Sequence, residues 1–430
     1  MSTLQSIRGM RDVLPEEALR FYTVEAVARR VLESFGYIEI RLPLLEPTEL
    51  FSRGVGETTD IVGKEMYTME DREGSSITLR PEGTAGCVRA GLQHGLLFNR
   101  VQRLWYAGPM FRHEKPQKGR YRQFDQIGAE AFGIPGPEID AELVQLCAIV
   151  FDALGVRSRL TLEINTLGGP EARASYRQAL VAYLQPLSNR LDEDSRRRLE
   201  RNPLRILDSK APETLALLAD APALEDHLDA AAHARFDELR TMLDTLGVAH
   251  TVNRRLVRGL DYYTHTVFEW VTDALGSQGT VCAGGRYDGL VALLGGRSTP
   301  GVGFAMGVDR LVLLADAMHI GDNVGPRAQV DVYCIATDRA RLAELLVFAQ
   351  RLRETLPGLR VGTQAQSGKF DAELKRAGES GAAAVLIVGA EQAPGEYRLR
   401  WLRSGRKDER LTADTVIEAL AGAQLASPAD

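Results

Sequence analysis

Apolar residues recur every three or four positions near the start of the chain. After Pro15 this spacing is that of one face of an amphipathic helix, and Gly36 supplies the expected stop. Residues 37–43 then alternate like a strand that ends at Pro43, and proline suits a strand end or edge because it cannot donate a ladder hydrogen bond. A helix followed by an edge strand can form a dimer interface. The recurring helical positions are Val24, Val27, Ala28, Val31, Leu32 and Phe35.

Six further runs have the composition and alternation of strands. Loops and helices of uneven length separate them, in place of the regular strand and helix alternation of a doubly wound fold. The pattern therefore favours an antiparallel α+β domain. The runs are 77–80, 103–107, 125–129, 161–164, 267–271 and 281–284.

The pattern changes at two places along the chain. From about Pro170 to Val248 it is largely helical and strongly charged, which indicates an inserted helical module. Beyond Gly325-Pro326, short apolar strands alternate with amphipathic helices. We therefore predict a first domain over 1–325, interrupted by the insertion 170–248, and a separate small α/β domain over 329–430. In the second domain we expect strands at 330–336, 360–364, 383–388 and 397–402, and helices at 341–356 and 370–378 before a last helix.

Length, charge and cysteine usage limit the class of protein. A chain of 430 residues is too long for one compact core, and its net charge of -6 gives no basic field over the whole chain. Any nucleic-acid partner must therefore meet local basic patches. Without C-x-x-C pairs or long apolar stretches, we expect no zinc site, no disulfide framework, no membrane span and a reducing, cytoplasmic location. The cysteines are Cys87, Cys147, Cys282 and Cys334.

A charged hairpin is the first candidate for chemistry. Arg112 leaves a predicted strand just before the lysine- and arginine-rich loop 115–122, and a second strand returns over 123–130. Guanidinium groups bind phosphate oxygens bidentately, so this hairpin can clamp a polyphosphate. A solvated charged hairpin without a ligand explains the segment equally well.

Two later segments place polar side chains beside glycines. In 256–264, Arg258 and the two tyrosines that follow can reach into a pocket from one strand end. Tyrosines half-buried on a sheet explain this segment better when it is taken alone. In 283–289, the paired glycines Gly284 and Gly285 either permit close backbone approach to a ligand or form a plain turn.

A fourth segment combines small residues with an arginine. Residues 301–307 are small enough to let a flat ring lie on the backbone of a strand, and Arg310 enters the following helix aimed at a phosphate. Each segment alone is a moderate signal, whereas the four in this order are highly specific.

With these segments the chain resembles the class II aminoacyl-tRNA synthetases, and among them the histidyl-tRNA synthetases of the bacterial type. Pro43 with its preceding helix is similar to the dimer motif of the class, 111–114 to the second motif and 301–310 to the third. The segments 256–263 and 283–288 are similar to the two signature peptides of the histidine enzymes. The resemblance covers nearly the whole chain, and the C-terminal domain is similar to the family's anticodon-binding module.

The resemblance implies an antiparallel sheet flanked by helices, a homodimer and a histidine-tRNA ligase. Such an enzyme activates L-histidine with ATP to histidyl-adenylate and pyrophosphate, and then transfers histidine to the 3′ end of tRNA(His). Activation is an in-line displacement, so catalysis is largely positioning and neutralisation of charge. Mg²⁺ would bridge the ATP phosphates, and no metal ligands of protein origin are assigned.

The same resemblance assigns roles to single residues. Arg258 and Arg112 are the expected catalytic residues at the α-phosphate, and Arg258 approaches from the amino-acid side, where other members of the class use an additional metal ion. Arginines of the insertion and the loop 115–122 are candidates for contacts with the acceptor end of tRNA. The expected ATP-binding residues are Arg112, Glu114, Arg120 and Arg310, and the expected histidine-binding residues are Glu82, Gly83, Thr84, Gln126, Glu130, Tyr262, Tyr263 and Tyr287.

Two other functions compete with this interpretation. One is the histidine-sensing regulatory subunit of ATP phosphoribosyltransferase, a synthetase-like protein that is not an enzyme. That paralogue typically lacks the anticodon domain and has eroded signature peptides. This chain has a domain similar to the anticodon-binding module and carries both signature-like segments. The other is an RNA-binding module without chemistry, which has no use for a complete set of arginines directed at phosphates.

Overall fold

The structure is a computed structural model that describes residues 4–57, 59–276, 279–320, 329–363, 369–402 and 406–423. The chain forms two compact units, Met1–Gly321 and Asp322–Asp430, and each is described by itself. The predicted change of pattern at Gly325-Pro326 lies outside the described residues. In the part of the chain that is described, no helix combines the length and apolarity that crossing a membrane requires.

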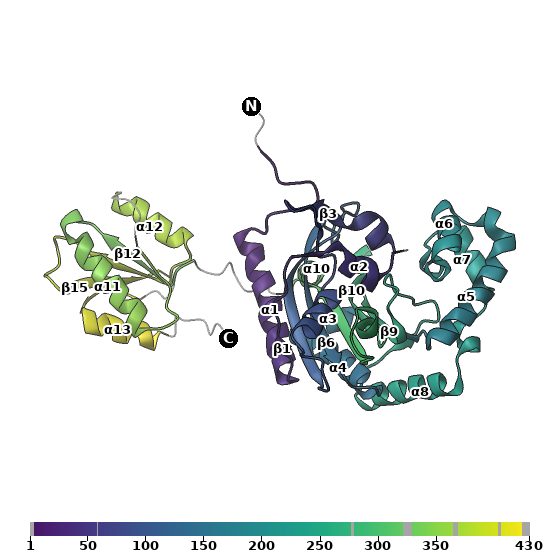
Figure 1. Ribbon diagram of the computed structural model, residues 1–430. Helices are drawn as coiled ribbons and strands as arrows, with labels where there is room; N and C mark the ends of the chain where they lie inside the picture. Colours follow the sequence, from purple (N-terminus) through teal and green to yellow (C-terminus); the bar gives the residue numbers. More distant parts are fainter. Residues whose placement is uncertain are drawn as a thin grey trace. The chain divides into compact units, whose positions relative to one another are not determined.

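A large central sheet organises the first unit and confirms the predicted α+β class (Figure 1). Its inner strands pair antiparallel, and only the two outermost strands pair in parallel. The strand expected over 37–43 is limited to two residues. In spatial order the strands are β1 (Ile38–Glu39), β5 (Gln102–Phe111), β6 (Gln123–Phe132), β11 (Gly301–Gly307), β10 (Thr280–Arg286), β9 (Thr264–Val271), β7 (Thr161–Thr166) and β8 (Thr251–Val252).

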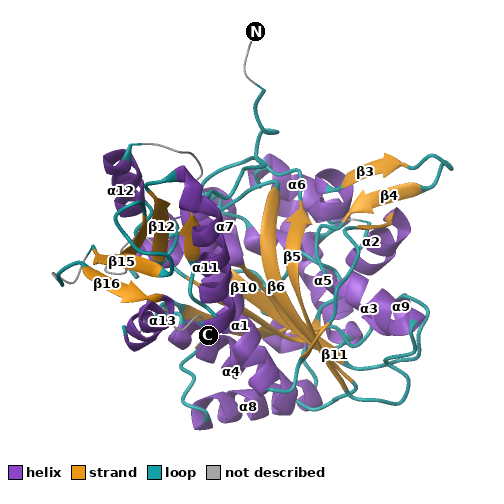
Figure 2. Ribbon diagram, turned by 90° about the vertical axis from the view of Figure 1, so that its left-hand side faces the viewer, coloured by secondary structure: helices purple, strands orange, loops and turns teal. Residues whose placement is uncertain are grey.

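Helices cover one face of this sheet. The helix α1 (Pro15–Ser34) buries Val24, Ala28, Val31 and Leu32 of its predicted apolar stripe. It packs beside α4 (Glu138–Ala153), as Figure 2 shows, and it also contacts α10 (Val308–Ala317). Trp105 of β5 joins this core, because successive strand residues point to opposite faces.

The other face of the sheet carries a second core, which includes Tyr106. On this side lie α2 (Thr48–Val55), α3 (Thr84–Gln93), α9 (Leu290–Leu293) and a three-stranded sheet of β2 (Leu45–Pro47), β4 (Ser76–Leu79) and β3 (Tyr67–Glu70). Residues 61–65 form a π-helical turn between α2 and β3.

Between β7 and β8 the chain forms a helical region over the range predicted as an insertion. Its α-helices are α5 (Pro170–Leu184), α6 (Glu193–Arg201), α7 (Pro212–Leu218) and α8 (Ala230–Thr245), joined by short 3-10 turns. Asp192 caps α6 and accepts hydrogen bonds from Ser195 N at 3.0 Å, Thr214 Oγ1 at 2.8 Å and Ser209 Oγ at 3.1 Å. Burial opposes them, but these donors hold the pKa of Asp192 well below its ordinary value.

The second unit has its own five-stranded sheet. In spatial order it consists of β13 (Val361–Thr363), β12 (Val332–Ala336), β14 (Ala384–Val388), β15 (Glu396–Trp401) and β16 (Glu409–Thr412). The first three strands are parallel and the last two pair antiparallel. The helices α11 (Leu342–Thr355) and α13 (Ala413–Gly422) pack with one core, and α12 (Phe370–Glu379) with another. The edge strand β16 was not predicted, because its largely exposed residues have no apolar alternation.

Candidate active site

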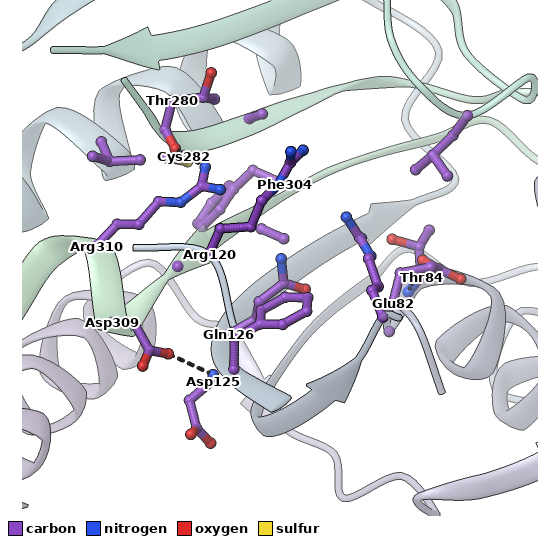
Figure 3. Close-up of a pocket in the computed structure, with 18 of the residues that line it drawn as sticks. Glu82, Thr84, Arg120, Asp125, Gln126, Thr280, Cys282, Phe304, Asp309 and Arg310 are labelled. Atoms are coloured by element: carbon purple, nitrogen blue, oxygen red, sulfur yellow. Dashed lines mark hydrogen bonds between the residues drawn. The ribbon is translucent and has the colours of Figure 1, made fainter. Parts of the chain in front are cut away.

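One solvent-open cavity, with about 920 Å³ of empty space, brings residues from all four chemically informative segments together (Figure 3). Arg120 and Arg310 lie on one side of it, and Glu82 and Thr84 on the other. Such a concave site with convergent polar groups is typical of a ligand pocket. Of the expected site residues, those that line it are Glu82, Gly83, Thr84, Arg112, Glu114, Arg120, Gln126, Arg258, Tyr262, Tyr263 and Arg310.

Arginine side chains from several segments line this cavity. Arg112 donates from Nε to the carbonyl of Pro81 at 2.8 Å, and Arg120 forms an ion pair with Glu114. Burial, together with the positive charges of Arg120 and Arg112, lowers the pKa of Arg310 to about 10. Arg310 remains cationic at neutral pH, so the cavity is suited to an anion with several charges.

The loop after Arg112 is tied to the beginning of the chain. Arg122 turns away from the cavity, and its guanidinium donates to the carbonyls of Glu114 and Arg8, both at 3.2 Å. Its backbone N–H donates to the carbonyl of Gly9 at 2.7 Å. Of the two arginines in the loop, Arg120 alone lines the cavity.

The N-terminal segment also reaches the cavity wall through Arg11. Its guanidinium lies 4.7 Å from the ring centre of Tyr121, a lining residue, and donates to Asp309 at 3.2 Å. Asp309 accepts from the backbone of Asp125 at 2.9 Å (Figure 3). Burial, with Asp309 nearby, raises the pKa of Asp125 to about 6. Sequence analysis did not identify these residues, because a contact across 298 positions leaves no local pattern.

Glu130 lies behind the cavity wall at the centre of a hydroxyl cluster. Its carboxylate accepts from Thr84 Oγ1 at 2.6 Å, from Tyr106 at 2.9 Å and from Tyr287. Burial raises the pKa of Glu130 to about 8, although the three hydroxyl donors act in the opposite direction. Glu130 and Tyr287, both expected to contact histidine, therefore lie one layer behind the lining residues.

Nearer the cavity, Glu82 accepts from the backbone N–H groups of Thr84 and Ala85 at 2.7 and 3.0 Å. It thereby holds the N-terminus of α3, where a negative charge is favourable, while burial raises its pKa. In contrast, Gln126 Oε1 and Tyr262 OH are buried without a hydrogen-bond partner among the described residues. Two such polar atoms at one cavity point to a polar ligand, because each costs about 1–3 kcal/mol if left unsatisfied.

Glycines next to the cavity make room for protein groups. A Cβ atom on Gly83 or on Gly128 would overlap the ring of Tyr106, so both positions are open for that ring. A Cβ atom on Gly284 would meet the carbonyl of Gly303 on the neighbouring strand. The structural reason for Gly284 is therefore close strand pairing, and not the ligand approach that its sequence context allowed.

Arg286, in the second signature-like segment, is a structural residue. It is fully buried and forms an ion pair with Asp140 of α4 at 2.6 Å. It also donates to the carbonyls of Ile134 and Gly136 at 3.1 and 2.7 Å. The neighbouring Tyr287 joins the hydroxyl cluster, so this segment supports the wall of the cavity.

Arg258 enters the cavity from the loop before β9. It forms an ion pair with Glu269, and its guanidinium lies 5.9 Å from the ring centre of Tyr263. The ring centres of Tyr262 and Tyr263 are 4.7 Å apart. Among the described residues, no three His, Cys, Asp or Glu side chains are grouped so that they could hold a metal ion.

Comparison with known families identifies both units. Residues 9–311 match the family model described as histidyl-tRNA synthetase, and residues 329–422 match that of the anticodon binding domain. Solved structures agree with this. The apo histidyl-tRNA synthetase of S. aureus superposes with a TM-score of 0.80 and 31% sequence identity, over 97% of this chain and 99% of that one.

Two more distant structures share the fold. A protein of Bacillus halodurans, titled an ATP phosphoribosyltransferase regulatory subunit/histidyl-tRNA synthetase, has a TM-score of 0.64 and 23% identity over 90% of this chain and 98% of that one. The histidyl-tRNA synthetase of Nostoc sp. has a TM-score of 0.68 and 20% identity over 98% and 100% of the two chains.

Proposed function

The chain belongs to the histidyl-tRNA synthetase family, and from that premise we propose that it is a histidine-tRNA ligase. It activates L-histidine with ATP to histidyl-adenylate and pyrophosphate, and then transfers histidine to the 3′ end of tRNA(His). The observation that carries this proposal is the convergence of Arg112, Arg120, Arg258 and Arg310 on one cavity beside unsatisfied polar atoms. A polyanion fits the arginines, and a small polar molecule fits the unsatisfied polar atoms.

Activation is the attack of the histidine carboxylate on the α-phosphorus of ATP, with pyrophosphate as the leaving group. Arg258 and Arg112 stabilise the charge that develops at the α-phosphate, while Arg120 and Arg310 hold the outer phosphates. Because Arg112 and Arg310 are anchored to the carbonyls of Pro81 and Gly119, little reorganisation accompanies the reaction.

Mg²⁺ belongs to this proposal as a companion of the ATP phosphates. It usually binds through one or two carboxylates together with substrate phosphates, and Glu114 lines the cavity. Burial and the nearby charge of Glu114 raise the pKa of Glu65, so two carboxyl groups lie close to each other at this point. When bound with ATP, the ion would neutralise part of the phosphate charge.

Histidine binding is proposed for the side of the cavity that carries Gln126, Tyr262 and Tyr263, with Glu82, Gly83 and Thr84 nearby. The unsatisfied oxygens of Gln126 and Tyr262 can accept hydrogen bonds from an ammonium group or an imidazole N–H. Glu130 and Tyr287 act from behind, since Glu130 fixes the hydroxyl of Thr84. An apolar analogue would leave these polar atoms unpaired, which favours selectivity.

Partners and location are part of the same proposal. The second unit, as a member of the anticodon binding domain family, reads the anticodon of tRNA(His), and the protein acts in the cytoplasm. A homodimer is proposed through the edge strand β1 and its surroundings, because Ile38 is 67% exposed and both Leu44 and Leu45 are 43% exposed.

A regulatory paralogue is the second candidate, since the B. halodurans protein carries that description in its title. The match to an anticodon binding domain and the complete set of arginines in the cavity favour the ligase. A regulator that only senses histidine needs neither.

Amino-acid-dependent ATP–pyrophosphate exchange, measured across the twenty amino acids, tests the proposal. We expect exchange with histidine alone and a loss of about 10²–10³-fold in Arg258→Ala, because a preorganised charge at the reacting phosphate is removed. Arg254→Ala is the matched control, since Arg254 lies four residues away in an exposed ion pair with Glu225. Histidine binding without exchange in the native chain would move the assignment to the regulatory paralogue.

A further inference from the structure

Arg258 is held by a carboxylate that sequence analysis did not single out. Glu269 on β9 pairs with Nη1 of Arg258, and the two side chains are only 16% and 17% exposed. The second oxygen of Glu269 accepts a hydrogen bond from Thr280 Oγ1 at 3.0 Å. Glu269 thus connects the loop that carries Arg258 to the first residue of β10.

Thr280 also contacts Arg310, which lines the same cavity. Its backbone carbonyl accepts a hydrogen bond from Nη1 of Arg310, whose Nε donates to the carbonyl of Gly119 at 3.0 Å. Figure 3 shows Thr280 beside the end of the Arg310 side chain. The pairing of β10 with β9 shifts register between Thr280 and Cys282, and such bulges re-aim side chains. Thr280 therefore contacts Arg310 directly through its carbonyl, whereas its hydroxyl contacts Glu269, the partner of Arg258.

The ion pair with Glu269 does not use all the hydrogen-bond donors of Arg258, so other donors can bind a ligand. Its Nε atom is buried and has no hydrogen-bond partner among the described residues. A carboxylate whose effect was only to neutralise Arg258 would weaken the binding of anions. A carboxylate that fixes the direction of the guanidinium instead lowers the reorganisation needed as charge builds up in the transition state.

We propose that Glu269 and Thr280 are positioning residues for adenylate formation, and that together they hold Arg258 and Arg310 at a fixed separation across the cavity. This inference rests on the proposed function. Because the effect acts on the transition state through Arg258, the loss of Glu269 lowers kcat of the exchange reaction and leaves KM for ATP nearly unchanged.

The sheet offers a matched control for Glu269. Glu163 on β7 stands directly opposite Glu269 in the strand register, and it accepts a hydrogen bond from Asn253 at 2.7 Å. Glu163→Gln therefore removes a carboxylate from the same part of the sheet without changing a contact of Arg258. We expect Glu269→Gln to lower kcat about 10–100-fold, as a small misplacement of a reacting group does, Thr280→Val to lower it less, and Glu163→Gln to leave it unchanged.

A double-mutant cycle separates positioning from a merely structural effect. In an Arg258→Ala background, Glu269→Gln is expected to cause no further loss, because residues that act as a unit are not additive. An equal loss in both backgrounds would overturn the proposal. So would a lower KM for ATP with an unchanged kcat, since that result marks simple neutralisation.

The failure of the proposed function would be recognised separately. If the native chain shows no exchange with any amino acid, the ligase assignment fails, and equilibrium binding of ATP then tests the positioning. Unchanged ATP binding in Glu269→Gln would support a carboxylate that orients Arg258 without neutralising it. Tighter binding would overturn it, because the carboxylate would then only weaken the attraction of the anion.

Discussion

Replacing Arg286 with Met removes one partner of a fully buried ion pair and leaves the other behind. Asp140 accepts from Arg286 Nη2 at 2.6 Å and from Nε at 3.2 Å, and both side chains are 0% exposed. The carbonyls of Ile134 and Gly136 also lose their donor. The variant strands a carboxylate and two carbonyl oxygens in the core between β10 and α4.

The expected cost is large for a single substitution. Removing one partner of a buried pair costs about 3–5 kcal/mol. Arg235 lies 3.5 Å from Asp140 and offsets a part of the loss. We therefore expect the free energy of unfolding of the first unit to fall by about 4 kcal/mol. Arg286→Met combined with Asp140→Leu is expected to recover much of it, because no buried charge remains.

The pH dependence has a definite sign. Burial already raises the pKa of Asp140 against the opposing charge of Arg286, and without Arg286 it rises further. A carboxyl whose folded pKa lies above its unfolded value contributes stability at low pH and loses it as the pH rises through the folded pKa. The loss in Arg286→Met is therefore smaller near about pH 5 than near about pH 8.

Guanidinium unfolding followed by tryptophan fluorescence measures this effect. Trp105 and Trp270 are buried in the first unit, so a Trp401→Phe background restricts the signal to that unit. Arg103→Met is the matched control, because Arg103 pairs with Glu142 on the same helix as Asp140 but both side chains are about 30% exposed, and we expect a loss of about 1 kcal/mol or less. Equal losses in the two variants, or a double variant no more stable than Arg286→Met, would refute the reasoning.

Three further predictions concern other parts of the first unit. Asp192→Ala is expected to lower the free energy of unfolding by about 2 kcal/mol. Asp229→Ala removes a cap with one backbone hydrogen bond at 2.7 Å and is expected to lower it by about 1 kcal/mol. Hydrogen exchange of the capped helices measures both losses, and equal losses would contradict the difference in the number of donors. Because burial raises the pKa of Glu130 from 4.5 to about 8, its stabilising contribution is present below about pH 4.5 and is lost as the pH rises through about 8. The free energy of unfolding, measured with urea, should therefore fall by up to about 1.4 kcal/mol per pH unit over this range, and Glu130→Gln should remove this fall. Parallel curves of stability against pH for the native chain and the variant would exclude the pKa shift. Gly128→Ala pushes a Cβ atom into the ring of Tyr106 and is expected to cost about 1–3 kcal/mol and to weaken histidine binding, as thermal melting and calorimetry can check.

The sequence predicted those helices and strands whose apolar residues recur with a regular period. The apolar stripe of α1 and the alternating runs of the central sheet follow from helix and strand periodicity, which each segment carries in itself. The strand β16 and the short extent of β1 escaped, because the exposed residues of a sheet edge need no alternation. The order of motifs likewise indicated the family and the arginines that line the cavity.

The sequence by itself determined the fold class and the family, and it indicated the arginines that line the cavity. Tertiary structure alone decided which of the candidate site residues face the cavity and which support it. Glu130 looks like a site residue by position, but packing of α3 against the sheet buries it behind Thr84, and packing of α4 buries Arg286 against Asp140. Glu269 looked like an ordinary strand residue until its carboxylate was seen to hold Arg258. The role of a charged group depends on its burial and its partners, and both are set by helices, loops and strands that meet only in the folded protein.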